Sequence, residues 1–247
     1  MKKLRFIMLT VGIICMSLLF HSCLDDDGYS LYDYRMEVAT VESLDSNQHY
    51  FKLDDGSTLW PANVIGYTGH NLDDGQRTWL NYTILSDDRD GFTHYVKVNG
   101  VDPILTKMIA EDLGEKNDSI YGTDPISVEH IWIGDGYLNL IFEFNYGERE
   151  RHFVNLIPKV SAGEGTSFEV EFRHNAYNDP PQRAVPGIVC FDLSTLPDTE
   201  GETVKLKVHV KTFKGEKTFE LDYNSDKDKV LERAPSSFDS DYFERVN

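Results

Sequence analysis

The feature that most constrains the fold is a strict alternation of apolar and polar residues, which recurs along the chain. In VKLKVHVKTF (residues 204–213), every second residue from Val204 to Val210 is apolar, and the residues between them are Lys or His. TSFEVEFRH (166–174) alternates in the same way. YLNLIFEFNY (137–146) places one apolar face on Leu138, Leu140, Phe142, Phe144 and Tyr146. Because a period of two puts alternate side chains on opposite faces of a strand, the chain is predicted to be mostly β.

Shorter alternating stretches occupy the first half of the chain. They are DYRMEVATVES, HYFKLDDGSTLWPAN, RTWLNYTIL and THYVKV, between residues 33 and 98. Hairpin turns are predicted at Asp54–Gly56, at Tyr146–Glu148 and at Gly215, because Gly and Asp adopt the backbone angles that tight turns need. The pattern predicts a barrel-like unit of short strands over residues 33–113, followed by an antiparallel β-sandwich of longer strands over residues 125–225.

The segment between these two units loses the alternation. One helix is predicted there, with Asp102 as its cap, Pro103 in its first position and an apolar face that ends before Gly114. A final strand through Ile104 and Leu105 is the alternative. Residues 114–124 are polar and rich in turn formers, so they are predicted to be a linker. Residues 226–247 also lose the alternation and are predicted to be a poorly ordered tail.

The N-terminus has the layout of an export signal. Basic residues come first, and an apolar run of about 15 residues follows from Phe6 to Phe20, which is short of the roughly 20 that span a bilayer. Residues 1–22 are therefore predicted to be a signal peptide, with an uncleaved anchor as the alternative. Ser22-Cys23 resembles a bacterial lipobox, in which a small residue precedes the cysteine that is lipidated. Cys23 is the predicted lipidation site, and a secreted protein without lipid is the alternative.

Three aspartates follow the predicted lipidation site. Asp25, Asp26 and Asp27 resemble the surface-export tag of lipoproteins in Bacteroidetes, and residues 23–32 are predicted to be an acidic tether. Several acyl chains on one cysteine, at about 0.8 kcal/mol per buried CH₂, hold a protein firmly at a membrane. The prediction is an outer-membrane lipoprotein exposed at the cell surface, with the periplasmic face as the alternative.

Charge and cysteine content limit the partners. The chain has 42 acidic and 24 basic residues, and loss of residues 1–22 would bring the net charge from −18 to about −21. Such a charge repels phosphate backbones, so a nucleic-acid partner is not expected. If Cys15 leaves with the signal and Cys23 is acylated, Cys190 is the one remaining thiol. It lies among apolar residues and is predicted to be buried and inert.

Motifs that carry chemistry are missing from the sequence. The stretch from Ser86 resembles the start of an EF-hand loop, but Lys97 occupies the position that needs a bidentate Glu. No HExxH, CxxC, GxSxG, P-loop or GxGxxG pattern is present. Weak calcium binding by a surface loop and a carboxylate pair for glycoside hydrolysis both stay open. The chain is predicted not to be an enzyme, and no metal or cofactor is expected besides the covalent lipid on Cys23.

One segment stands out as a candidate binding loop. Polar side chains bunch together where a strand ends, at Arg173, His174, Asn175, Asn178 and Asp179, and Pro180, Pro181 and Pro186 follow them. Polar residues on a loop held by strands are a common setting for binding sites. The alternative is that Asn and Asp cap the turn and that Arg173 pairs locally.

The order of these elements resembles a known family. The series YLNL…RHNAYND…FDLS, from Tyr137 to Ser194, together with the lipobox, DYRMEVATVES and YFKLDDGSTLWPAN, is similar to the NigD-like lipoproteins of Bacteroidetes. That resemblance implies an OB-like N-terminal domain, a C-terminal β-sandwich and a role in bacteriocin immunity through a protein or peptide partner. OB folds also bind oligosaccharides, so a glycan-binding accessory lipoprotein of a polysaccharide uptake system is the alternative.

Overall fold

The computed structural model describes residues 29–45, 48–62, 72–159 and 168–227. The chain divides into two compact units, residues 1–30 and residues 31–247, and every element below belongs to the second. Cys23, the three aspartates after it and most of the predicted tail lie outside the described residues. Of the predicted tether, Leu31 and Tyr32 are exposed.

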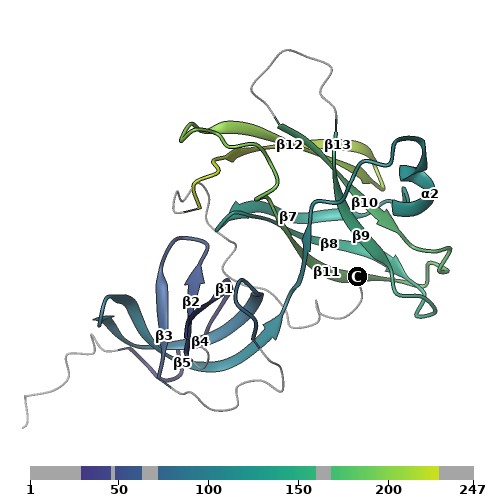
Figure 1. The fold of residues 1–247 in the computed structure, drawn as a ribbon. Coiled ribbons are helices and arrows are strands. Elements are labelled where there is room, and N and C mark those ends of the chain that lie inside the picture. The colour runs from purple at the N-terminus through teal and green to yellow at the C-terminus, as the bar shows by residue number, and fades with distance from the viewer. Residues whose placement is uncertain (1–28, 46–47, 63–71, 160–167, 228–247) are drawn as a thin grey trace, which may run out of the picture. The chain divides into compact units, whose positions relative to one another are not determined.

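The first five strands form a closed barrel (Figure 1). Their order around it is β1-β2-β3-β5-β4, and all neighbours are antiparallel except β3 and β5. Closure leaves the barrel without sheet edges. The strands are β1 (Arg35–Asp45), β2 (Gln48–Leu53), β3 (Thr58–Pro61), β4 (Arg77–Arg89) and β5 (Phe92–Pro103).

The alternation predicted for these strands fills the barrel. Phe51, Leu59 and Val96 come from three different strands and are fully buried in one cluster. The β2–β3 turn contains Gly56 with φ of +82°, in the left-handed region that favours glycine, as predicted for Asp54–Gly56. The first half of the chain is therefore a barrel with its apolar faces turned inward.

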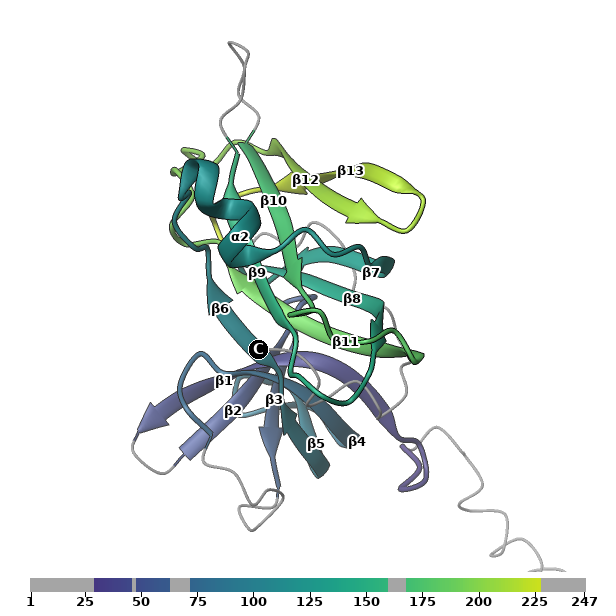
Figure 2. The same ribbon diagram turned by 90° about the vertical axis from the view of Figure 1, so that its right-hand side faces the viewer.

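Eight further strands form two sheets (Figure 2). One has the order β13-β12-β10-β9, and the other β6-β11-β8-β7. Most pairs are antiparallel, but β10–β12 and β11–β6 are parallel. The strands are β6 (Leu105–Met108), β7 (Ser127–Gly134), β8 (Tyr137–Tyr146), β9 (Phe153–Pro158), β10 (Phe168–Asn175), β11 (Arg183–Asp192), β12 (Val204–Thr212) and β13 (Gly215–Tyr223).

The two sheets pack face to face as a sandwich. Phe142, Phe172 and Val208 come from both sheets and are buried in one cluster. The prediction of a mostly β chain, with a barrel followed by a sandwich, is confirmed. The predicted hairpin turn at Gly215 is present between β12 and β13, and Gly215 has a φ of +109°. The hairpin turn predicted at Tyr146–Glu148 is wrong, because β8 and β9 belong to different sheets and this segment crosses from one sheet to the other.

Strand β8 differs from the prediction on its second face. The sequence pattern predicts one apolar face, but Tyr137, Asn139 and Ile141 on the opposite face are buried as well. Tyr137 and Ile141 pack with Val38 and Trp79 of the barrel, in a cluster that also contains Trp132 and Cys190. The first half of this face of β8 therefore contacts the barrel, whereas Glu143 and Asn145 further along the same face are exposed.

The helix predicted from Asp102 to Gly114 is wrong, and the alternative of a strand there is confirmed. Strand β5 continues to Pro103, Ile104 is buried, and β6 pairs with Val189–Asp192 of β11. Tertiary pairing overrides a helix pattern that rests on propensity alone. Strand β6 lies in the range predicted for the barrel and belongs to the sandwich sheet. Within 114–124, the predicted linker, lie a 3₁₀ turn (Gly114–Lys116) and the short helix α2 (Asn117–Tyr121), which packs on β9 and β10 (Figure 2).

Candidate functional site

The predicted binding loop divides into buried and surface residues. His174 and Asp179 are 3% and 8% exposed, so they point into the protein. Arg173 pairs with Asp118 at 2.7 Å and with Glu171 at 3.2 Å. These pairs connect β10 to α2 and to its own strand, so they hold the surface part of the loop in place.

The asparagines of this loop stabilise the turn after β10. The Asn175 side chain accepts a hydrogen bond from the Tyr177 backbone N–H and donates one to the Ile120 carbonyl. Tyr177 and Asn178 have φ of +49° and +61°, a conformation that Asn tolerates better than most residues. The structure therefore brings His174 and Asp179 into one buried cluster, and it leaves Arg173, Asn175 and Asn178 in the surrounding turn.

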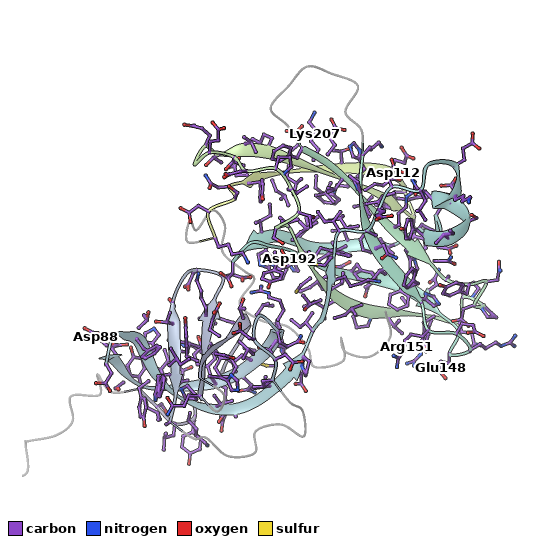
Figure 3. The ribbon with its side chains drawn as sticks, viewed as in Figure 1. Asp88, Asp112, Glu148, Arg151, Asp192 and Lys207 are labelled. Atoms are coloured by element: carbon purple, nitrogen blue, oxygen red, sulfur yellow. The ribbon has the colours of Figure 1, made fainter. Side chains whose placement is uncertain are left out.

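The buried cluster includes a third residue that the sequence pattern does not reveal. His152, just before β9, is fully buried, and its Nδ1 lies 2.9 Å from His174 Nε2. Its Nε2 lies 3.2 Å from Asp179 Oδ2. The Asp179 carboxylate also accepts hydrogen bonds from the backbone N–H groups of Gly147 and Arg149. The cluster therefore ties the β8–β9 turn, where Glu148 and Arg151 lie (Figure 3), to the loop between β10 and β11.

The charges in this cluster follow from burial and hydrogen bonding. Burial, followed by the neighbouring His152, lowers the pKa of His174 to about 4. Burial also lowers the pKa of His152, although Asp179 opposes that shift. Burial alone would raise the pKa of Asp179, but the backbone N–H donors and His152 bring it below its ordinary value. At neutral pH the cluster is an aspartate beside two neutral imidazoles, and no group is left exposed for catalysis.

A second buried polar network lies between the barrel and the sandwich. Arg77, at the start of β4, is fully buried and donates to Asp54 Oδ1 at 2.6 Å, to Asn139 Oδ1 at 3.0 Å and to Thr40 Oγ1 at 2.9 Å. The other Asp54 oxygen accepts a hydrogen bond from Trp132 Nε1 at 2.7 Å. Asp54 and Thr40 belong to the barrel, and Trp132 and Asn139 to the sandwich, so the network fixes one to the other.

The electrostatics of this network favour the charged form of Arg77. Burial alone would lower the pKa of Arg77, but the Asp54 carboxylate raises it above its ordinary value. Close by, burial raises the pKa of the Cys190 thiol to about 11. A thiol in that state is not a nucleophile near neutral pH. The sequence prediction that Cys190 is buried is confirmed, and the geometry assigns this network to the assembly of the fold.

A groove of about 300 Å³ lies on one side of the sandwich. Its walls are the start of β7 and the β12–β13 hairpin. Backbone hydrogen bonds fix the two walls, because the Ile126 N–H donates to the Lys211 carbonyl at 3.1 Å and the Phe213 N–H donates to the Ile126 carbonyl at 3.3 Å. The side chains that define it are Ile126, Val128, Phe213, Lys214, Lys217 and Phe219.

The register of the hairpin shows which side chains face the groove. Lys217 pairs with Val210, and Phe219 with Val208, so both share the inward face of the sheet. The Lys217 ammonium lies 4.3 Å from the centroid of the Phe219 ring. Phe213, in the turn, is 50% exposed. The groove thus combines apolar side chains with polar ones, and Lys217 places a cation beside the Phe219 ring. In the sequence, only Gly215 pointed to this place, as a predicted turn.

A partly buried aromatic cluster lies on the barrel. The Phe92 ring centroid is 5.2 Å from that of Tyr50 and 4.8 Å from that of Trp60. These residues come from three strands and have intermediate exposure. Aromatic rings of this kind can stack on sugars, and they can also simply cover a sheet.

Metal sites and membrane-spanning helices are both absent from the residues that the structure describes. No group of three or more His, Cys, Asp or Glu residues there is arranged to hold a metal ion. Within the same ranges, no helix has both the length and the hydropathy that crossing a membrane requires. The predicted lipidation site Cys23 and Asp25–Asp27 lie outside them.

The fold defines a class: a two-part, all-β protein with an N-terminal barrel and a C-terminal sandwich. Residues 38–104 match the model of the NigD-like N-terminal OB domain, and residues 108–223 match that of the NigD-like C-terminal β-sandwich domain. The chain belongs to the NigD-like family. The resemblance that the sequence suggested, and the OB-like character of the barrel, are therefore confirmed.

Solved structures agree with this assignment. A toxin-related protein from Parabacteroides distasonis is 47% identical, with 79% of this chain and 96% of that one covered and a TM-score of 0.71. A protein of unknown function from Bacteroides vulgatus is 24% identical, with 87% and 100% covered and a TM-score of 0.71. A NigD-like immunity protein from Bacteroides caccae is 20% identical, with 77% and 93% covered and a TM-score of 0.59. No functionally curated protein matches the chain.

Proposed function

We propose that this chain is a non-enzymatic lipoprotein that binds a protein or peptide partner outside the cytoplasm, in the manner of a bacteriocin immunity protein. Lipid on Cys23 holds it in the outer membrane, and Asp25–Asp27 direct it to the cell surface. The single structural observation that carries the binding role is the groove beside β7 and the β12–β13 hairpin, which joins exposed apolar surface to a cation.

The other polar clusters support a binding role over catalysis. The histidines and Asp179 bond to one another inside the sandwich, and Arg77 and Asp54 hold the barrel against it. Both clusters make the frame rigid, and a rigid frame that presents a groove reduces the entropy lost when a partner binds.

The immunity role is favoured by two relatives. One, 47% identical, is described as toxin-related, and the other, 20% identical, is described as a NigD-like immunity protein. Only the first is similar enough in sequence to support a shared role, so the role needs a direct test.

That test is a deletion of the gene in the producing strain, with complementation. We expect the deletion strain to become sensitive to the bacteriocin of its own strain, and the wild-type gene to restore resistance. A Cys23→Ser variant cannot carry the lipid, so it should not be anchored in the membrane and should fail to restore resistance. Unchanged sensitivity after deletion would overturn the immunity role.

The location is tested on intact cells. Mass spectrometry of the N-terminus should show an acylated Cys23, and external protease should remove the protein. Replacement of Asp25, Asp26 and Asp27 by Ala should leave the lipid in place and protect the protein from protease. Acylated protein that is protected in the wild type would place it on the periplasmic face.

A second candidate function is glycan binding, which the aromatic cluster of Tyr50, Trp60 and Phe92 favours. A glycan array probed with the wild type and with Trp60→Ala tests it. Binding that Trp60→Ala abolishes would support a role in polysaccharide uptake, and an array without binding by a folded protein would remove it.

A further inference from the structure

The two edges of the sandwich, one formed by β6 and β9 and the other by β7 and β13, differ in what covers them. On one side, the Ala110 N–H donates to the carbonyl of Leu156 in β9 at 2.8 Å, and the Lys107 ammonium donates to the Val154 carbonyl at 2.9 Å, so the segment around β6 covers the edge of β9. On the other side, β7 and β13 are the end strands of their sheets. The groove lies on this second side, where no further strand pairs with β7 or β13 among the residues that the structure describes.

Of the two end strands there, β13 is the better template for another strand. It pairs with β12 over its nine residues without a register shift, from Gly215 to Tyr223. Strand β7 has an irregularity between Val128 and His130, and such bulges blunt strand pairing. The first four residues of β13 are exposed. An extended peptide can add to an edge of this kind through main-chain hydrogen bonds, while pockets select its side chains.

The charge of the groove selects the side chains of such a peptide. Lys214 and Lys217 line it and form no ion pair with a carboxylate in the part of the chain that the structure describes, whereas Lys205 pairs with Asp222 at 2.6 Å on the outward face. Two acidic groups are near: Glu216 lines the groove, and Glu129 accepts from the Ser127 hydroxyl. Lys214, Lys217 and Glu216 give the groove lining a net charge of +1. The chain as a whole has a net charge of −18, so the groove differs in sign from the rest of the protein.

We propose that the groove binds an extended segment of a protein partner, which adds as a strand along β13, packs an apolar side chain on Phe219 and Val128, and places a carboxylate at Lys217 and Lys214. The carboxylate is either an acidic side chain or the C-terminus of the segment. The inference rests on the proposed function, because it names the partner chemistry of the same groove.

The probes are nine-residue peptides that match the length of β13, blocked at both ends except where a free C-terminus is stated. One alternates Val and Glu, a second alternates Val and Lys, and a third alternates Val and Gln with a free C-terminal carboxylate. A fourth carries Pro at two central positions of the Val/Glu sequence, because Pro removes the N–H groups that strand pairing needs. Binding is measured by calorimetry with the full-length protein in detergent.

We expect the Val/Glu peptide to bind, and the Val/Lys and Pro-containing peptides not to bind. Lys217→Glu should weaken binding about tenfold, as loss and reversal of one interfacial charge does. Lys211→Glu is the matched control: Lys211 lies on the same hairpin, pairs with Glu216 in the register and points to the opposite face, so its reversal should leave the affinity unchanged. If the free-carboxylate peptide binds and the Val/Glu peptide does not, the carboxylate is a C-terminus.

Two results would overturn the proposal. One is that neither carboxylate peptide binds, and the other is that Lys211→Glu weakens binding as much as Lys217→Glu does. In that second case the loss of affinity comes from the overall charge of the hairpin and not from a contact at Lys217. The immunity assay separates this failure from failure of the proposed function. If Lys217→Glu protects cells as well as the wild type, the function stands and the groove is not its site; if the wild type gives no protection, the function fails whatever the peptides show.

Discussion

Two buried aspartates of this protein are neutralised in different ways. Asp54, between the barrel and the sandwich, faces the guanidinium of Arg77, which is charged at every accessible pH. Asp179, inside the sandwich, faces His152, a neutral imidazole at neutral pH, and backbone N–H groups. Each aspartate also has a glycine against it, Gly134 at Asp54 and Gly147 at Asp179.

The comparison shows that burial alone does not decide whether a polar group is charged. At Arg77 burial alone would lower the pKa, but the Asp54 carboxylate raises it above its ordinary value. Arg, Trp and Asn side chains donate hydrogen bonds to that carboxylate in place of water. At the histidines no opposite charge is close enough to offset burial for both rings, so the neutral form is favoured and the pKa of His174 falls to about 4. One cluster should therefore be insensitive to mild acid, and the other sensitive.

The largest effect is expected from Asp54→Ala. The substitution leaves the Arg77 guanidinium buried without a carboxylate, and such a loss costs about 3–5 kcal/mol of unfolding free energy. Urea unfolding at pH 7 measures it. The double variant Asp54→Leu with Arg77→Met removes both charges and should recover part of the loss. A single variant no less stable than the wild type would show that the network is not buried as described.

The next effect is a pH dependence that comes from the histidine cluster. In the folded protein the pKa values of His174 and His152 lie below 6.5, so as the pH falls below that value the unfolded state takes up protons that the folded state does not. Stability should fall from pH 6.5 to about 4, by about 3 kcal/mol from His174. Urea unfolding at several pH values measures the slope. His174→Gln should flatten it, and an equal slope in that variant would contradict the assignment.

A smaller effect is expected when either glycine becomes alanine. A Cβ at Gly147 would lie 2.1 Å from the Pro180 carbonyl oxygen, and one at Gly134 would lie 2.2 Å from Asp54 Cγ. Both clashes should cost about 1–3 kcal/mol, and more at Gly147, because a backbone atom yields less than a side chain. Thermal unfolding compares them with Gly100→Ala, where the nearest atom is 3.9 Å away. Equal melting temperatures for all three would contradict these close approaches.

The smallest effect is expected from Asp222→Ala at the surface. Asp222 pairs with Lys205 at 2.6 Å, but both side chains are about half exposed. Exposed pairs contribute about 0–1 kcal/mol, because water screens them and ordering two long side chains costs entropy. The salt dependence of urea unfolding measures it. A loss as large as that of Asp54→Ala would show that exposure does not separate the two kinds of ion pair.

Part of the candidate site was predictable and part was not. His174 and Asp179 were singled out as polar residues at a strand end, and the structure does bring them together. His152 was missed, because it is 22 residues away from His174 and no metal or catalytic spacing connects them. Asp54 was interpreted as a turn residue, which it is, but its 78-residue separation from Trp132 hides the network. Lys217, the cation in the groove, was missed because alternation alone does not show which strand lies at the edge of a sheet.

The sequence by itself determined the local structure: the strands, the inward face of β12, the turns at Gly56 and Gly215, and the family. Local alternation sets these, because neighbours two residues apart share a face whatever surrounds them. Only the tertiary structure decided what covers each face. It placed the barrel on the second face of β8 and extended β5 to Pro103 where a helix was predicted. It also made Leu105–Met108 a strand of the sandwich and, among the described residues, made β13 the end strand of its sheet. These outcomes depend on contacts between residues far apart in the chain, whose packing and desolvation energies no local pattern contains.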